Sequence, residues 1–172
     1  MAQASRLAPF IRKWEGGFVN DASDLGGATN KGITIATYTT YRISKGLPKP
    51  TVSDLKRMKD AEWLEIFKTM YWDKFRADEI QSQSVADICV DWIWMSGNTA
   101  IKRVQKVLGV KRDGIVGPKT LSAINSVSPL PLFGMIKGER KKYYDEICRK
   151  RPANKKFLKG WMNRLDDLQF EE

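Results

Sequence analysis

The spacing of apolar residues is the feature that most constrains the fold of this chain. Apolar side chains recur at i, i+3, i+4 and i+7 near the start of the chain, and the same spacing returns within residues 61–75 and 84–96. Such a stripe is typical of an amphipathic helix, whereas the alternation typical of strands is nearly absent. The first stripe consists of Leu7, Phe10, Ile11 and Trp14. The pattern predicts a mainly α fold.

Helix boundaries follow from local start and stop signals. Gly16 and Gly17 end the first helix, and the loop that continues to Gly32 is rich in Gly, Asn and Asp and has room for a small β-hairpin. Thr34 is a candidate cap for the next helix. Further helices are predicted to start at Ser53 or Asp54, Asp60, Ser84, Asn98 and Pro118, and to cover residues 130–150 and 154–169.

The charge of the chain is unevenly distributed. Residues 1–96 carry 13 basic and 12 acidic side chains, whereas residues 97–172 carry 17 and 8. This shift coincides with the only candidate boundary, at Ser96-Gly97-Asn98. The basic second half predicts an anionic partner such as nucleic acid, an acidic membrane face or the bacterial cell wall. The alternative is that Lys and Arg simply solvate the outer faces of helices.

Several function classes are excluded by composition. The chain has no histidine, which removes Ser-His-Asp triads, Cys-His pairs and nearly all His-bearing zinc sites, and no metal or cofactor is implied. Cys89 and Cys148 are expected to be reduced core residues. No apolar run reaches the length of a membrane helix, and residues 1–15 do not resemble a signal peptide. We therefore expect synthesis in the bacterial cytoplasm, with no transmembrane segment.

Glu15 is the carboxylate with the most distinctive position. It stands at the C-terminal end of the first predicted helix, where carbonyl groups present partial negative charge, and aromatic residues are close in sequence. Both features favour a protonated carboxyl group, which is the state that a general acid needs. Gly16 and Gly17 leave room for a bulky substrate.

Two further carboxylates, Asp21 and Asp24, follow in a polar loop and are expected to stay ionised. Two carboxylates in contrasting environments are typical of glycoside hydrolases. One donates a proton to the leaving oxygen, and the other positions water or stabilises the sugar cation. Spacing alone favours solvated helix-end and turn-capping roles for these residues over catalysis.

The stretch "EGGFVNDASDLGGATNKGIT" (15–34) resembles the signature of glycoside hydrolase family 108, lysozyme-like N-acetylmuramidases of phages, prophages and bacteria, some described as secretion-activating proteins. The resemblance continues through "YWDKF", and the three stretches "VADICVDWIWMSG", "RVQKVLGVKRDGIVGPKTL" and "FLKGWMNRL" look like the peptidoglycan-binding domain usually fused to that catalytic domain. It implies a lysozyme-like catalytic domain over residues 1–96 and a helical peptidoglycan-binding subdomain over 97–172, packed on the first.

By this resemblance Glu15 would be the proton donor. Asp24, nine residues later, would be the second acidic group, and Thr34 would hold the attacking water. The chain departs from the commonest family pattern at Phe18, Ala22 and Ala28, where Tyr, Pro and in some members Glu stand. If that Glu were obligatory, activity would be weak, although Asp21 or Asp24 could replace it.

Four residues are expected to bind substrate: Asp21, Asp91, Trp94 and Asn98. Asp91 and the neighbouring Asp87 lie beside Trp92 and Trp94, so they could offer acceptors and aromatic faces to sugars. The structural alternative, which the residue pattern favours for Asp87 and Asp91, is that buried aspartates satisfy backbone or Arg partners. Asn98 is also the expected cap of the helix that begins there.

The motif "KRDGIVGPKT" (111–120) contains an Asp-Gly turn and a proline at the start of a helix. The turn itself is structural, and by resemblance the region helps to bind peptidoglycan, whose peptide carboxylates are negative. The residues expected in this wall-binding loop are Asp113, Gly114, Gly117 and Thr120.

The sequence therefore predicts a monomeric muramidase that cleaves the β-1,4 bond between N-acetylmuramic acid and N-acetylglucosamine, with peptidoglycan as its partner. It would act after release or export, as an endolysin, prophage enzyme or secretion activator. One alternative is a cell-wall-binding protein without catalysis. A second is a basic helical nucleic-acid binder, although no nucleic acid is expected, because no nucleic-acid-binding motif is present and the first half is nearly neutral.

Overall fold

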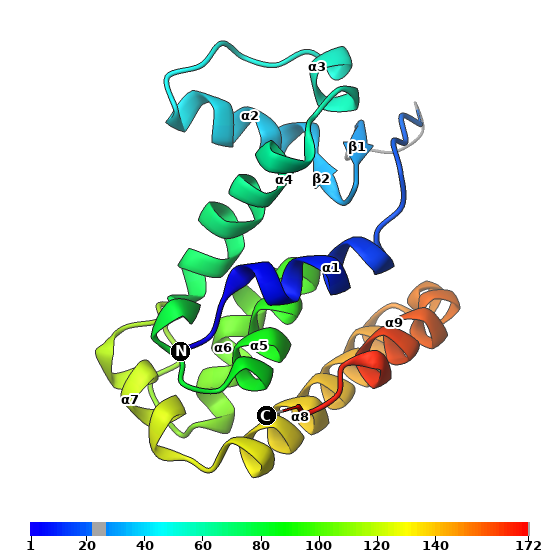
Figure 1. The fold of residues 1–172 in the computed structure, drawn as a ribbon. Coiled ribbons are helices and arrows are strands. Elements are labelled where there is room, and N and C mark those ends of the chain that lie inside the picture. Colours follow the sequence, from blue (N-terminus) through cyan, green and yellow to red (C-terminus); the bar gives the residue numbers. More distant parts are fainter. Residues whose placement is uncertain (22–26, 172) are drawn as a thin grey trace. The chain divides into compact units, whose positions relative to one another are not determined.

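A computed structural model describes residues 1–21 and 27–171 of the chain. Contacts divide the chain into two compact units (Figure 1). We call Ala4–Tyr71 the N-terminal unit, and Met1–Gln3 together with Trp72–Glu172 the C-terminal unit. The predicted boundary between two domains, after residue 96, is based on charge distribution and family resemblance rather than on contacts. It stays a prediction.

The N-terminal unit contains short helices and one hairpin. Its elements are α1 (Ala4–Trp14), β1 (Thr29–Asn30), β2 (Ile33–Thr34), α2 (Ile35–Ser44), α3 (Val52–Lys56) and α4 (Asp60–Phe67). The predicted first stripe is confirmed in α1, where Leu7 and Ile11 are buried. Helix α3 starts earlier than predicted, because Thr51 and Asp54 form a reciprocal capping box at its N-terminus.

The small hairpin expected in the glycine-rich loop is confirmed. Strands β1 and β2 pair antiparallel, with Thr29 opposite Thr34, and the turn between them places Lys31 at φ 49° and Gly32 at φ 79°. Positive φ at both turn positions matches the right-handed twist of a two-residue hairpin. Asn30 is buried and its amide donates to the carbonyl oxygen of Leu55 at 2.8 Å, which anchors the hairpin to α3.

The predicted helix through residues 61–75 is interrupted. Helix α4 ends at Phe67, a π-helical turn η1 (Lys68–Trp72) follows, and a 3-10 turn η2 (Asp73–Phe75) completes the segment. A π turn accommodates an additional residue and rotates the side chains that follow it, and such turns are frequent at functional sites. Apolar spacing alone does not distinguish this arrangement from a continuous α-helix.

The C-terminal unit consists of longer helices. It contains η3 (Ala77–Glu79), α5 (Gln83–Ser96), α6 (Asn98–Val107), α7 (Pro118–Ser126), α8 (Pro129–Lys150), η4 (Pro152–Asn154) and α9 (Lys155–Asp167). Helix α5 is the buried central helix that its apolar face predicts, and it packs on α6 and α8. Figure 1 shows α9 lying alongside α8, in agreement with their contacts. The fold class, mainly α with one small hairpin, is confirmed.

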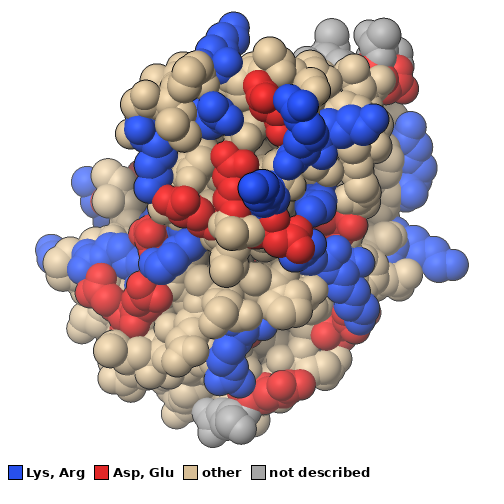
Figure 2. Space-filling model, turned by 45° about the horizontal axis from the view of Figure 1, so that its top comes forward, with Lys and Arg blue, Asp and Glu red and all other residues tan. Residues whose placement is uncertain are grey.

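Many charges of the C-terminal unit are neutralised internally. Arg103 lies 3.0 Å from Glu139 and also pairs with Glu146, and Lys106 lies 2.7 Å from Glu139. Hydrogen bonds from Lys106 and Arg103 lower the pKa of Glu139 although burial opposes them, so its carboxylate stays charged. On the face of the molecule drawn in Figure 2, which is not confined to this unit, basic and acidic side chains also lie beside one another. Part of the basic excess therefore has partners within the unit.

Cys89 and Cys148 are free and buried, in agreement with the expected reduced core residues. Burial raises the pKa of the Cys89 thiol. No helix within the described residues is long and apolar enough to cross a membrane.

Candidate active site

Glu15 directly follows the last residue of α1. Its backbone N–H donates to the carbonyl oxygen of Arg12 at 3.3 Å, which continues the helical turn, and its side chain is partly exposed. An added Cβ at Gly16 or Gly17 would meet no other described atom within 4 Å. The described residues therefore leave open space around the two glycines that follow Glu15 in the sequence.

Tyr71, in the π turn, lies close enough to Glu15 for their charges to interact. Burial is the main cause that raises the pKa of Tyr71; a hydrogen bond from Thr37 opposes it, and the charge of Glu15 adds to it. The phenol is therefore a neutral hydroxyl throughout the physiological pH range. A neutral hydroxyl next to a carboxyl group can donate a hydrogen bond to it or to a bound sugar.

Thr34 and Thr37 lie at the start of α2 in the same unit. The Thr34 hydroxyl is the N-cap: it accepts the backbone N–H of Thr37 at 3.2 Å, and the two hydroxyl oxygens are also 3.2 Å apart. Because Thr37 is bonded to Tyr71 in turn, a row of hydroxyl groups leads from the hairpin to the neighbourhood of Glu15. We define the polar cluster as Thr34, Thr37 and Tyr71, which are joined by hydrogen bonds, together with Glu15, which interacts electrostatically with Tyr71.

Two predicted acidic residues belong to the loop before the hairpin. Asp21 is exposed, and Asp24 lies outside the described residues. Ala28, where some family members carry Glu, is buried, and its carbonyl oxygen accepts the backbone N–H of Ile35 at 2.9 Å.

Asp91 requires a correction to its predicted substrate-binding role. It is completely buried in α5, and its carboxylate oxygens lie 2.7 Å from both Arg140 of α8 and Arg164 of α9. A sugar hydroxyl would have to displace these guanidinium groups from the core, so Asp91 ties three helices together instead. This is the structural alternative that the residue pattern also favours.

Trp94 and Asn98, the other predicted binding residues of the C-terminal unit, are at least partly exposed. Trp94 lies in the last turn of α5. Asn98 is the first residue of α6 rather than its cap, because Gly97 occupies the N-cap position with φ 57°. Its side chain lies against Gly114, where an added Cβ would be 2.4 Å from the Asn98 amide nitrogen.

The predicted wall-binding loop owes its shape to Gln105, which is buried in α6. The Gln105 amide nitrogen donates to Asp113 at 2.9 Å and to the carbonyl oxygen of Ile115 at 3.0 Å, and its amide oxygen accepts from the backbone of Gly114 at 2.9 Å. Thr120 is buried, and Gly117 is the N-cap of α7. The conformation of the loop therefore depends on Asp113, Gly114 and Thr120, whatever the loop binds.

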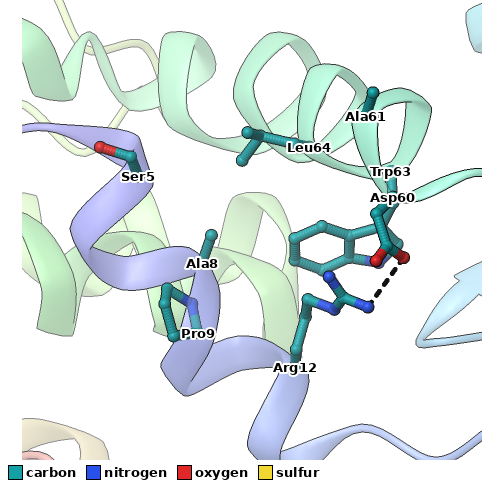
Figure 3. Close-up of a pocket in the computed structure, with 8 residues that line it drawn as sticks. All are labelled: Ser5, Ala8, Pro9, Arg12, Asp60, Ala61, Trp63 and Leu64. Atoms are coloured by element: carbon teal, nitrogen blue, oxygen red, sulfur yellow. Dashed lines mark hydrogen bonds and ion pairs between the residues drawn. The ribbon is translucent and has the colours of Figure 1, made fainter.

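A cavity of about 520 Å³ lies between α1 and α4 of the N-terminal unit (Figure 3). At one end Arg12 lies 2.8 Å from Asp60 and stands over the Trp63 ring at 5.6 Å. Hydrogen bonds from Lys31 and Arg12 lower the pKa of Asp60, which keeps this ion pair charged. The residues that line the cavity do not include Glu15 or Thr34, so it is separate from the polar cluster.

Among the described residues, no group of three or more His, Cys, Asp or Glu side chains could hold a metal ion.

Two family models match this chain. The model described as glycosyl hydrolase 108 matches residues 8–97, which is more than half of the chain, and the model described as a predicted peptidoglycan domain matches residues 99–166. The chain belongs to glycosyl hydrolase family 108. It is a glycoside hydrolase whose partner is peptidoglycan, as the resemblance of its motifs predicts.

A solved structure of similar fold is that of SagA from Brucella abortus. It is 29% identical in sequence, superposes with a TM-score of 0.80, and the match covers 96% of this chain and 90% of that one. No curated protein matches the chain.

Three residues of these sites could not be identified from the sequence. Tyr71 falls on the apolar stripe of a predicted helix, and only the π turn brings it to Glu15. Thr37 and Gln105 carry no motif, because a hydroxyl or amide on a helix face usually meets water. An unusually Thr- and Tyr-rich α2 is the one signal that could have pointed to Thr37.

Proposed function

We propose that this protein is an N-acetylmuramidase that hydrolyses the β-1,4 bond between N-acetylmuramic acid and N-acetylglucosamine, with Glu15 as the proton donor. The observation that carries the proposal is the position of Glu15. It directly follows α1, precedes Gly16 and Gly17, where an added Cβ would meet no other described atom, and belongs to the polar cluster through its electrostatic interaction with Tyr71. Membership in the family and the match to a peptidoglycan domain support the same substrate.

In the proposed reaction, Glu15 gives its proton to the glycosidic oxygen while the bond to the anomeric carbon breaks. Thr34 donates its hydroxyl to Thr37 and accepts one N–H, so a lone pair remains that can accept a hydrogen bond from water. Water held in this way keeps its own lone pairs for attack on the anomeric carbon. Asp24 is proposed to accept the proton that this water loses, or to balance the positive charge of the sugar.

The test is the release of new reducing ends from purified peptidoglycan by wild type and by Glu15→Gln. General acid catalysis contributes about 10² to 10⁴-fold, so the variant should lose about three orders of magnitude in rate. Its thermal unfolding should match wild type, because Gln preserves the size of the side chain. Wild-type release of reducing ends by Glu15→Gln would refute the assignment of the proton donor.

The same assay separates the enzyme from a wall-binding protein without catalysis. That rival predicts no release by wild type but undiminished sedimentation of the protein with cell walls. We also propose that the hydrolysis serves cell lysis or secretion, in which local opening of the wall is the useful outcome.

A further inference from the structure

The C-terminal unit has a cavity of about 490 Å³ where the loop after α6 meets the start of α7. Its lining combines apolar and charged side chains. The lining residues include Val110, Lys111, Asp113, Ile115, Pro118 and Lys119.

The loop that forms the cavity wall is held in place by two side chains of α6. Gln105 holds Asp113, Gly114 and Ile115 through the hydrogen bonds described above, and Gly114 has φ 77° with the Asn98 side chain directly against it. A residue with a Cβ would be strained at this φ and would collide with Asn98. The cavity is therefore built in advance of binding, which reduces the entropy lost when a ligand binds.

Two lysines line this cavity without forming an ion pair with a described carboxylate. Lys111 and Lys119 are exposed, and no described carboxylate lies within ion-pair distance of either. This differs from Lys106, Lys137 and Lys141 of the same unit, which are paired with Glu139 or Asp166. The one acidic group in the lining, Asp113, accepts hydrogen bonds from the backbone N–H of Ile115 at 3.0 Å and from Gln105. These bonds lower the pKa of Asp113, and the charge of Lys111 lowers it further although the two side chains form no ion pair.

Backbone donors add to the positive character of the cavity. Gly117 is the N-cap of α7 and offers no side-chain cap, and the first intrahelical bond of this helix goes from Leu121 to Gly117. The N–H groups of Lys119 and Thr120 lie in this first turn, where the helix supplies no acceptor for them. The positive end of the helix dipole favours a negative ligand at the same place.

We propose that this cavity binds a free carboxylate of the peptide stem of peptidoglycan, with Lys111 and Lys119 as its cationic partners. The carboxylate would lie between these lysines and the start of α7, and the small aliphatic side chains of a stem would contact Val110, Ile115 and Pro118. Neutral sugar hydroxyls have no need of two unpaired cations. The inference rests on the proposed function, in that the protein acts on peptidoglycan.

The test measures the affinity of the full chain, carrying Glu15→Gln so that glycan is not consumed, for two soluble probes. One is a disaccharide peptide from peptidoglycan with free stem carboxylates, and the other is the same molecule with these carboxylates amidated. We expect tighter binding of the free acid, and a rise in its Kd of about tenfold in Lys111→Gln/Lys119→Gln, which corresponds to about 1.4 kcal/mol.

The matched control is Lys142→Gln/Lys155→Gln, which removes two exposed lysines of the same unit that are not part of the cavity lining. It should change the Kd by less than about twofold, in line with the small effect of screened surface charges. Circular dichroism of both double variants should match that of the parent.

Equal affinity for the free and amidated probes, or an unchanged Kd in Lys111→Gln/Lys119→Gln, would overturn the inference. Selective binding of a wall phosphate polymer in place of the disaccharide peptide would overturn it as well. Its failure is distinguishable from failure of the proposed function. With wild-type Glu15 restored, the lysine variants should still release reducing ends from glycan strands stripped of their stems, and an inactive wild type would instead refute the hydrolase assignment.

Discussion

Glu15 of the N-terminal unit and Asp91 of the C-terminal unit look alike in the sequence but differ in the structure. Each is a carboxylate next to a tryptophan in an amphipathic helical segment. Glu15 follows the last turn of α1, is partly exposed and interacts electrostatically with Tyr71. Asp91 lies in the middle of α5 and is completely buried between two guanidinium groups.

The difference shows that the sequence neighbours of a carboxylate do not determine where it lies or what it contacts. Two arginines lie against the oxygens of Asp91 and block access to them, whereas Glu15 is partly open to solvent. The following predictions test this contrast, beginning with the largest expected effect on free energy.

Replacing Asp91 by Asn should destabilise the protein by about 3 to 5 kcal/mol, because Arg140 and Arg164 would remain buried without their counter-ion. Urea unfolding followed by circular dichroism measures this loss. Asp145→Asn, an exposed carboxylate on α8, is the control and should stay within about 0.5 kcal/mol of wild type. A loss below 1 kcal/mol for Asp91→Asn would place this residue with the accessible carboxylates.

Replacing Gly17 by Val should lower the rate of peptidoglycan hydrolysis by about tenfold or more, since displacements near 1 Å can cost up to 10²-fold. Folding should be unaffected, because a Cβ at this position meets no other described atom. Gly134→Ala on α8 is the control: it also fills open space and should leave hydrolysis unchanged. Full activity of Gly17→Val would show that the space beside Glu15 does not receive the glycan.

Replacing Thr34 by Ala should cost about 1 kcal/mol of stability through the lost helix cap. It should also slow hydrolysis, whereas Thr34→Ser should keep both properties. Thr51→Ala, which removes the cap of α3, should produce a similar loss of stability without a change in rate. Equal rates for Thr34→Ala and Thr51→Ala would reduce Thr34 to a structural cap.

The smallest effect concerns Asp54, the carboxylate of the capping box at the start of α3. Hydrogen bonds from the backbone and side chain of Thr51 lower the pKa of Asp54 below its ordinary value of 3.8. The folded state therefore binds this proton less readily than the unfolded state, so the stability from Asp54 is present above pH 4 and is lost at lower pH. The difference in thermal midpoint between wild type and Asp54→Ala should shrink between pH 5 and pH 3. A difference that grows in acid would contradict this sign.

Much of the fold could be predicted from the sequence, because helix periods, glycine stops and caps are local signals. The hairpin at Lys31-Gly32 and the start of α7 at Pro118 are of this kind. The π turn at Lys68–Trp72 could not be predicted, since it depends on how its side chains pack and not on which residues are apolar.

The candidate site could be predicted only in part. Glu15 and Thr34 stand out through their positions at a helix end and a helix start. Tyr71 and Gln105 do not, because each acts through a contact with residues remote in sequence or across a loop. The structural role of Asp91 also depends on distant residues. Its arginine partners are 49 and 73 residues away in the sequence, and no local pattern near Asp91 predicts them.

The location of the two thiols has a practical consequence. Both cysteines of the chain belong to the C-terminal unit and are shielded from solvent, while residues 4–71 contain none. An alkylating reagent can therefore modify the protein only when that unit opens, so labelling followed by mass spectrometry records its opening rate separately from events around Glu15. The native chain thus carries its own kinetic probe, and no engineered label is required.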